Sequence, residues 1–337
     1  MRVLVTGARG MLGREVARRL AARGDTVTVL QRGVSGLAGP RAGIPEVIAE
    51  VRADLADAGA IRRAVEGQDA VVHLAARVGV TGAWPDFERA NIAGTRSVVD
   101  ACRLHGVGRL VHVSTPSVAH AGSSLVGAPA TPADPDRARG HYARSKAVAE
   151  QIALAAADHL PVVAIRPHLV WGPGDTQLVA RMVQRARAGR LPVIGSGAAL
   201  VDTTYVGNAA DALVAALDHC DAARGRTLVV SNGEPRPIAE LIGDICVAAG
   251  SSPPSRHVPV VLATAAGAVV EALWSNRARV DRSADEPPIT RFVAEQLSTA
   301  HWFDQRETRR VLRWQPATSI DDGLAELTRW YVEHPDR

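Results

Sequence analysis

The stretch "VLVTGARGMLGREVARRL", residues 3–20, places three glycines between a short apolar run and an amphipathic helical pattern. Glycine permits a tight turn after a strand and lets the backbone approach a pyrophosphate, which then rests on the free amides at the helix amino end. An ordinary glycine-rich turn is the alternative, but the strand before the loop and the helix after it favour a dinucleotide site. The residues expected to hold the dinucleotide here are Gly7, Arg9, Gly10, Met11, Leu12 and Gly13.

The first half of the chain continues this alternation of strand and helix. Apolar runs rich in β-branched residues recur at 26–31, 46–54, 69–76, 109–115 and 161–167. Because these runs are apolar throughout, they are typical of parallel strands that are covered on both faces. Helical patterns fit between the runs, at 13–23, 58–66, 91–105 and 142–159. The sequence therefore predicts an α/β fold with a doubly wound parallel sheet, the Rossmann architecture.

After Pro167 the alternation gives way to glycine- and proline-rich loops and to more helices. The helices are expected at 177–189, 208–219, 237–249, 260–275 and 319–333. We expect residues 1–167 to form the dinucleotide-binding domain, with 201–232 returning to it through a strand at 226–232. Residues 168–200 and 233–337 are expected to form a smaller, mostly helical substrate-binding domain, and 33–43 a mobile loop.

The composition narrows the class of protein. The chain of 337 residues is 47% hydrophobic and carries a net charge of +4 without a run of like charges, which argues against a nucleic-acid partner. The three cysteines, Cys102, Cys220 and Cys246, lack metal-ligand spacing, so we expect reduced buried thiols and no metal site. The chain opens directly on a strand pattern, which leaves no room for a leader and predicts a cytoplasmic location.

One apolar stretch, "VPVVLATAAGAVVEALW" at 258–274, is close to the length that spans a bilayer. It falls short of roughly 20 residues and contains Pro259 and Glu271. We therefore expect a helix buried in a domain or lying over an apolar pocket, with a helix resting on a membrane surface as the alternative.

The end of the second predicted strand bears on the choice between NAD and NADP. An acidic residue there would hydrogen-bond the ribose hydroxyls of NAD, but this chain has Gln31 followed by Arg32. An amide does not repel a 2′-phosphate and a guanidinium can bind one, so NADP(H) is expected, with Arg9 as a second cation. Solvated arginines are the alternative. Further cofactor contacts are expected at Asp54, Leu55, Ala75, Ala76 and Asn91, the last also as the N-cap of a helix.

Tyr142 and Lys146 lie one helical turn apart in "GHYARSKAVAEQ", residues 140–151. A phenol with a pKa of about 10 is a poor proton donor at neutral pH, and a nearby ammonium lowers that pKa. The pair could then protonate a ketone oxygen as hydride arrives from NADPH. A group that polarises the carbonyl is expected among Ser114, Thr115 and Ser117, which follow a predicted strand at the edge where ligands bind. Two polar residues on a solvated turn are the alternative for Tyr142 and Lys146.

Together these motifs resemble the extended short-chain dehydrogenase/reductases, which carry TGxxGxxG, a Ser/Thr after a central strand, and YxxxK. The resemblance covers nearly the whole chain. It is strongest to the branch related to 3β-hydroxysteroid dehydrogenases, and within it to bacterial reductases of 2-alkyl-3-ketoalkanoic acids in olefin and β-lactone biosynthesis. The stretches that carry it are "STPSV", "HYARSKAVAEQ", "IRPHLVWGPGD", "LVDTTYVGNAADA", "SNGEP" and "FDQRETRRVLRWQP".

The resemblance implies roles for individual residues. Tyr142 would be the catalytic acid/base, Lys146 its partner and a ligand of the cofactor ribose, and Thr115 the catalytic hydroxyl. Pro167 and His168 would lie by the nicotinamide, although His168 could equally be a structural histidine. The residues that would line or support the substrate site are Ser117, Trp84, Trp171, Asp202 and Tyr205; a place in the core is the alternative for the tryptophans, and a helix cap for Asp202.

The leading interpretation is an NADPH-dependent reductase that converts a long-chain 2-alkyl-3-keto acid into the 2-alkyl-3-hydroxy acid. The alternatives are a dehydrogenase of hydroxysteroids or hydroxy lipids, a nucleotide-sugar epimerase or dehydratase, and an NADP-sensing regulator without turnover. The apolar stretch at 258–274 and Gln31-Arg32 disfavour the sugar nucleotide, and a regulator has no need of Tyr142 and Lys146. The expected partners are a lipid-like keto acid and a second copy of the chain, with contacts to a membrane or to pathway enzymes left open.

Overall fold

The computed structural model describes residues 1–37, 48–79, 82–119, 122–280 and 291–335. Most of the loop expected at 33–43 therefore lies outside the described residues. The central sheet is parallel throughout and has the order β12-β7-β5-β4-β1-β2-β3, which confirms the predicted fold class. Its strands are β1 (Arg2–Thr6), β2 (Thr26–Gln31), β3 (Ala49–Arg52), β4 (Ala70–His73), β5 (Arg109–Val113), β7 (Val162–Pro167) and β12 (Thr227–Val230).

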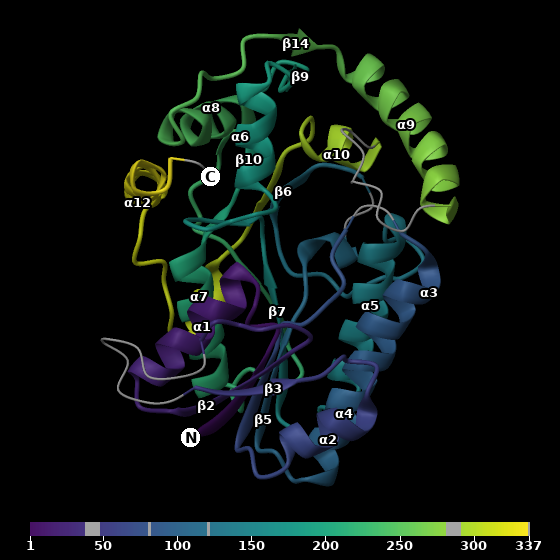
Figure 1. Cartoon of the computed structure of the whole chain (residues 1–337), viewed down its shortest axis with the longest axis vertical. Coiled ribbons are helices and arrows are strands. Elements are labelled where there is room, and N and C mark those ends of the chain that lie inside the picture. The colour runs from purple at the N-terminus through teal and green to yellow at the C-terminus, as the bar shows by residue number, and fades with distance from the viewer. Residues whose placement is uncertain (38–47, 80–81, 120–121, 281–290, 336–337) are drawn as a thin grey trace.

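Helices cover both faces of this sheet (Figure 1). One face carries α1 (Met11–Ala22) and α7 (Val206–Asp218); the other carries α2 (Ala58–Val65), α4 (Gly94–Leu104) and α5 (Gly140–Leu154). Because side chains alternate along a strand, Val3 and Val5 pack toward α1 and α7, while Leu4 packs toward α2 and α4. The chain order reverses between β1 and β4, so their carboxyl ends border the crevice where ligands bind in such sheets.

The remaining elements form a cap over the carboxyl edge of the sheet (Figure 1). Its helices are α6 (Val179–Arg187), α8 (Ile238–Ala248), α9 (Val260–Val280), α10 (Arg291–Gln296) and α12 (Ile320–Glu333). It also contains a small sheet of β6 (Leu125–Ala128), β10 (Leu200–Val201), β13 (Arg236–Pro237) and β15 (His301–Phe303). The sequence does not predict this sheet because its strands are only two to four residues long, too short for a pattern to register.

The other elements are short. They are α3 (Trp84–Phe87), a π-helical turn (Glu88–Ala93), a 3-10 turn (Pro116–Ala119), β8 (Val170–Trp171), β9 (Val193–Ile194), β11 (Thr204–Tyr205), β14 (His257–Val258) and α11 (Arg306–Leu312). Of these, β8 pairs with β11, and β9 pairs with β14 within the cap. Residues 201–232 contribute α7 and β12 to the sheet layers. Val311, Leu312 and Trp314 join the same core, so part of 233–337 also stabilises the main domain.

The apolar stretch at 258–274 forms most of α9, which runs along the outside of the cap (Figure 1). Val261 is 78% exposed and Leu262 61%, so a fully buried helix is wrong. Ala263 is buried against Ala294 of α10 in a cluster that also holds Leu297, a residue of the cavity described below. The helix thus lies against the wall of an apolar pocket, the other arrangement expected. Within the described residues, no helix combines the length and apolarity needed to cross a bilayer.

Candidate active site

The glycine loop between β1 and α1 is packed so closely that side chains are excluded from it. Gly7 has φ +82°, and a Cβ built on it would lie 2.9 Å from the backbone nitrogen of Ala75. A Cβ on Gly13 would lie 2.5 Å from the carbonyl oxygen of Gly7. The N-cap residue of α1 is Gly10, so no N-cap side chain accepts hydrogen bonds from the backbone amides of the first turn of the helix. This cradle fits the pyrophosphate of a dinucleotide.

Two arginine side chains lie near the carboxyl end of β2, Arg9 from the glycine loop and Arg32 from the residue after the strand. A Cβ on Gly33 would lie 3.1 Å from Nη1 of Arg9, which places that guanidinium directly beyond the strand. The side chain of Arg32 is 79% exposed and its Nη1 lies 4.0 Å from Oδ2 of Asp54. Gln31, in contrast, is buried and donates its amide to Glu50 at 3.2 Å. The arrangement leaves Arg9 and Arg32 beside the place where an adenosine ribose would lie.

The other residues expected to contact the cofactor, after β3 and β4, differ in their hydrogen bonds and burial. Asp54 accepts a hydrogen bond from the amide of Ala56 at 2.9 Å, and the Leu55 side chain is buried in the core against α4. Ala75 follows β4 and donates its amide to Thr6 Oγ1 at 3.0 Å, with Ala76 next in the chain. Small side chains thus border the glycine loop on this side.

Asn91 does not cap a helix, which corrects the prediction. The helical segment begins upstream at α3, and Asn91 lies within the π-helical turn that joins α3 to α4. Its Oδ1 accepts from the amide of Arg77 at 2.7 Å, and its Nδ2 donates to Oγ of Ser145 at 2.9 Å. Since Ser145 precedes Lys146, Asn91 fastens the loop after β4 to the turn of α5 that carries the lysine.

Tyr142 and Lys146 both lie on the first turns of α5, as predicted. Nζ of Lys146 donates to the carbonyl oxygen of Val113 at 2.7 Å. Burial lowers the pKa of this lysine to about 8, although the negative charge of Glu150 acts to raise it. Tyr142 lines the cavity, and burial raises its pKa to about 12. Burial therefore raises the phenol pKa, whereas the sequence led us to expect that a nearby ammonium would lower it. At neutral pH Tyr142 is in the form that can donate a proton.

If the chain reduces a ketone as the sequence leads us to expect, the lysine gives that reaction a pH dependence. Lys146 is positively charged below a pH of about 8 and neutral above it. The charged form favours loss of the Tyr142 proton to the substrate, so kcat/KM should be highest below this pH and fall as the pH rises through it. A pH–rate profile measures this, and Lys146→Arg should lack the fall if it is active. A wild-type profile that stays flat through the alkaline range would contradict the assignment.

Three hydroxyl groups follow β5, and the structure separates them. Oγ1 of Thr115 lies 3.1 Å from Oγ of Ser117, and both residues line the same cavity as Tyr142. The hydroxyl of Ser114 is buried and has no hydrogen-bond partner among the described residues. Thr115 and Ser117, and not Ser114, are therefore in place to contact a substrate oxygen.

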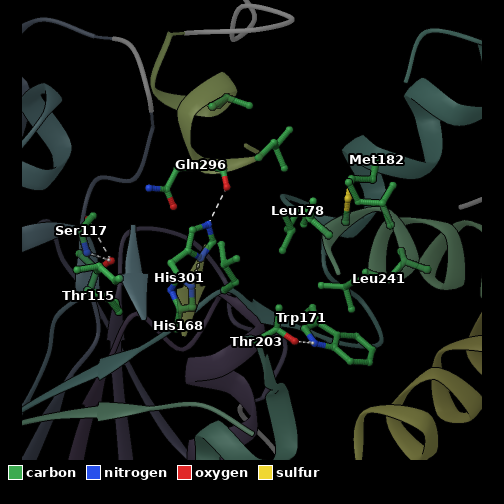
Figure 2. Close-up of a pocket in the computed structure, with 18 of the residues that line it drawn as sticks. Thr115, Ser117, His168, Trp171, Leu178, Met182, Thr203, Leu241, Gln296 and His301 are labelled. Carbon is green, nitrogen blue, oxygen red and sulfur yellow. Dashed lines mark hydrogen bonds between the residues drawn. The ribbon is translucent and has the colours of Figure 1, made fainter. Parts of the chain in front are cut away.

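A cavity of about 300 Å³ lies between the sheet edge and the cap. Figure 2 shows Thr115 and Ser117 on one side of the cavity and Leu178, Met182 and Leu241 on the other, with His168, His301 and Gln296 between them and Thr203 beside Trp171. The described residues that line it are Thr115, Pro116, Ser117, Leu125, Tyr142, His168, Leu169, Trp171, Leu178, Met182, Thr203, Ile238, Leu241, Ile242, Ile245, Val293, Gln296, Leu297, His301 and Phe303. A ligand with a polar head and an apolar tail matches this division.

Trp171 is in this lining, held by a hydrogen bond from its Nε1 to Oγ1 of Thr203 at 3.0 Å. Tyr205 stands behind it: the two rings are 5.5 Å apart and edge to face, and the Tyr205 hydroxyl contacts Glu326. Tyr205 therefore supports the wall without being part of it.

Asp202 and Trp84, which were also expected to line or support the substrate site, are not among the described residues that line this cavity. Asp202 is fully buried, accepts a hydrogen bond from Ser231 and one from the amide of Gly233 at 3.2 Å, and has its pKa raised to about 6 by burial. It holds together the loops after β10 and β12. Trp84 packs under the guanidinium of Arg144, 5.1 Å from its ring centre, on the outside of α5.

His301 and Gln296 are cavity residues that the sequence did not indicate. His301 is the first residue of β15 and meets His168, which is 133 positions earlier in the chain. No local motif signals either residue, because the strand is three residues long and the contact depends on the fold of the cap. Pro167, the last residue of β7, leads directly into His168.

Comparisons with known proteins were made for the whole chain. Residues 3–231 match the family model described as the NAD dependent epimerase/dehydratase family. The chain is 42% identical to 2-alkyl-3-oxoalkanoate reductase of Stenotrophomonas maltophilia, over 97% of this chain and 98% of the relative. It is 37% identical to 2-alkyl-3-oxoalkanoate reductase of Shewanella oneidensis, over 96% and 84%.

A more distant relative, 3 beta-hydroxysteroid dehydrogenase/Delta 5-->4-isomerase of Mycobacterium tuberculosis, is 28% identical over 98% of this chain and 90% of its own. Among solved structures, the DesIV double mutant (dTDP-glucose 4,6-dehydratase) of Streptomyces venezuelae with NAD bound superimposes with a TM-score of 0.74. That structure is 26% identical and covers 100% of this chain and 98% of its own.

Proposed function

The chain belongs to the NAD dependent epimerase/dehydratase family, and on this premise we propose that it is an NADPH-dependent reductase of a 2-alkyl-3-keto acid. The product would be the 2-alkyl-3-hydroxy acid. The two relatives of highest identity described above carry the name of this activity, and the resemblance of the motifs agrees with it. A cytoplasmic location, a homodimer and a place in olefin or β-lactone biosynthesis remain predictions from the sequence.

The observation that carries the proposal is the division of the cavity. Tyr142, Thr115 and Ser117 supply the groups that a ketone oxygen needs, and side chains such as Leu241 and Met182 supply a surface for an alkyl chain. At about 300 Å³ the cavity lies within the size range of small-molecule sites. It therefore offers room for a ligand that places a polar head against the hydroxyl groups and hydrocarbon against the apolar wall.

A nucleotide sugar suits this cavity poorly. Its diphosphate and sugar hydroxyls need cationic or hydrogen-bonding partners, because burying unpaired polar groups costs several kcal/mol. Among the described residues that line the cavity there is neither an arginine nor a lysine. The distribution of lining residues favours a substrate that is largely hydrocarbon.

The residues have distinct parts in the proposed reaction. Bound NADPH supplies the hydride that reaches the carbonyl carbon. Tyr142, protonated at neutral pH, donates its proton to the oxygen that becomes the alcohol. Lys146 stabilises the phenolate that remains, and its bond to the carbonyl of Val113 fixes the ammonium in place. The hydroxyls of Thr115 and Ser117 share one hydrogen bond, so one of them is left to donate to the same oxygen and orient the ketone.

Arg32 is proposed to select NADPH over NADH. Removing a charge-assisted contact to a 2′-phosphate should raise the KM for NADPH about tenfold in Arg32→Ala, while the KM for NADH changes little. Arg62→Ala, which removes an exposed arginine of α2, is the matched control. Initial rates with each cofactor measure the effect. An equal change for NADH and NADPH would remove Arg32 from phosphate recognition.

Substrate class is tested by following NADPH absorbance with a panel of 2-alkyl-3-keto acids, 3-ketosteroids and nucleotide sugars. We expect consumption with the keto acids, and a higher kcat/KM when an alkyl branch is present. Consumption with nucleotide sugars alone, or with no member of the panel, would refute the proposed function.

A further inference from the structure

One carboxylate holds both ends of the loop that follows β2. Oε2 of Glu50, in the neighbouring strand β3, accepts a hydrogen bond from Nε2 of Gln31 at 3.2 Å and from the backbone amide of Ser35 at 2.8 Å. The hydroxyl of Ser35 donates to the same oxygen. Gln31 and Ser35 are 5% and 2% exposed, so this loop, residues 31–35, is anchored at two buried positions on either side of residues 32–34.

The pairing of the strands explains why Glu50 can reach both ends of the loop. β2 and β3 are parallel with Val29 opposite Glu50, and alternate side chains of a strand point to the same face of the sheet. Gln31 and Glu50 therefore lie on the face covered by α1, where Val29 is part of the core. From that helix, Nη2 of Arg14 donates to the carbonyl oxygen of Ser35 at 2.9 Å. The loop is thus fixed both to β3 and to α1.

The middle of the loop is exposed and carries the arginine proposed to bind the 2′-phosphate. The side chain of Arg32 is 79% exposed. Gly33 lies against the guanidinium of Arg9, since a Cβ on this glycine would be 3.1 Å from Nη1. A long arginine side chain loses conformational freedom when it binds an anion, and a backbone that is already ordered lowers the total entropic cost. The anchored loop therefore holds the backbone of Arg32 beside Arg9.

We propose that Glu50 is a positioning residue for recognition of the 2′-phosphate of NADPH, acting through the loop 31–35 and Arg32. The assignment rests on the preference for NADPH in the proposed function. Glu50 needs no contact with the cofactor for this role, because its oxygens accept hydrogen bonds from Gln31, Ser35 and Arg52.

The charge of Glu50 makes the expected effect distinctive. Hydrogen bonds from the hydroxyl and amide of Ser35, and then from Arg52, lower the pKa of Glu50 to about 2, so it is ionised at neutral pH. Removing a negative charge near an anion site would by Coulomb's law strengthen the binding of the anion. If Glu50 acts by holding the loop, its removal weakens binding instead, because Arg32 must then be ordered when the phosphate binds.

Calorimetry with adenosine 2′,5′-bisphosphate and with 5′-AMP tests the proposal without turnover. The two ligands differ only in the 2′-phosphate, and wild type should bind the bisphosphate about tenfold more tightly or better. In Glu50→Ala the affinity for the bisphosphate should fall about fivefold, and that for 5′-AMP less than about twofold. Glu50→Gln retains an oxygen that can accept from the amide of Ser35, so it should restore part of the affinity.

Three further variants separate positioning from loss of charge or of structure. Glu66→Ala removes an exposed carboxylate at the end of α2 and should change the binding of either ligand by less than about twofold. Ser35→Ala removes one donor and keeps the backbone amide, so it should show a smaller selective loss, and it decides the result if Glu50→Ala does not fold. In Arg32→Ala, the added change Glu50→Ala should have little further effect on the bisphosphate, since the loop acts through that arginine.

The outcomes separate this role from the proposed function. A selective loss in Glu50→Ala that disappears in the background of Arg32→Ala supports the positioning role. In folded variants, unchanged or tighter binding of the bisphosphate, equal losses for both ligands, or a loss that adds fully to that of Arg32→Ala overturns the role and leaves the preference for NADPH standing. Equal binding of the two ligands by wild type overturns that preference and the positioning role with it.

Discussion

Tyr142→Phe is expected to reduce turnover with a 2-alkyl-3-keto acid by about a hundredfold or more, the usual size of a general-acid contribution. The ring that lines the cavity is retained, and only the proton that the ketone oxygen receives is lost. Because burial raises the pKa of Tyr142 to about 12, the native phenol is protonated at neutral pH. Binding of NADPH, measured by fluorescence titration, should change little.

Tyr331→Phe is the matched control. Tyr331 lies in α12, is nearly buried and is not part of the cavity lining. Its variant should keep turnover within about threefold of wild type, since it removes a hydroxyl far from the proton transfer. Turnover of Tyr142→Phe close to that of wild type would show that Tyr142 is not the proton donor.

Glu150→Ala is expected to cost about 3–5 kcal/mol of unfolding free energy, the range found when one partner of a buried ion pair is removed. Glu150 lies on α5 one turn after Lys146, and its oxygens accept from Nε and Nη2 of Arg166 in β7 at 2.9 and 2.5 Å. Both side chains are 1% exposed, so the variant leaves the guanidinium without its carboxylate in the core. Urea denaturation followed by circular dichroism measures the loss.

An exposed ion pair of the same chemistry is the control. Arg226 and Glu307 are 2.7 Å apart with side chains 45% and 56% exposed, and Glu307→Ala should cost less than about 1 kcal/mol. The double variant Glu150→Leu with Arg166→Met should recover much of the loss, because it removes the unpaired charge as well. Equal losses for Glu150→Ala and Glu307→Ala would show that the buried pair does not fasten α5 to the sheet.

The sheet and the catalytic helix could be predicted because local sequence determines them. The strands β1, β4, β5 and β7 are apolar runs rich in β-branched residues and are buried along most of their length. Such a run has few other stable environments. The spacing of Gly7, Gly10 and Gly13 follows from backbone contacts within one loop. Tyr142 and Lys146 are four positions apart, so a helix at this point was enough to predict that they lie on one face.

What could not be predicted depends on contacts between distant segments. Asn91 resembles a helix cap in sequence, but its partners are Arg77 and Ser145. The raised pKa of Tyr142 follows from its burial in the folded chain, which no pattern in α5 encodes. His301 reaches the cavity only because β15 pairs with β6 and β10, strands too short to recognise.

The central claim is that this chain transfers hydride to the C3 carbonyl of a 2-alkyl-3-keto acid. The most direct measurement supplies NADPH labelled with deuterium at C4 of the nicotinamide, on each face in turn, and examines the product by mass spectrometry. The account predicts a 2-alkyl-3-hydroxy acid with deuterium at C3 from one of the two labelled forms. Absence of deuterium in the product from both forms, or no hydroxy acid at all, would contradict it.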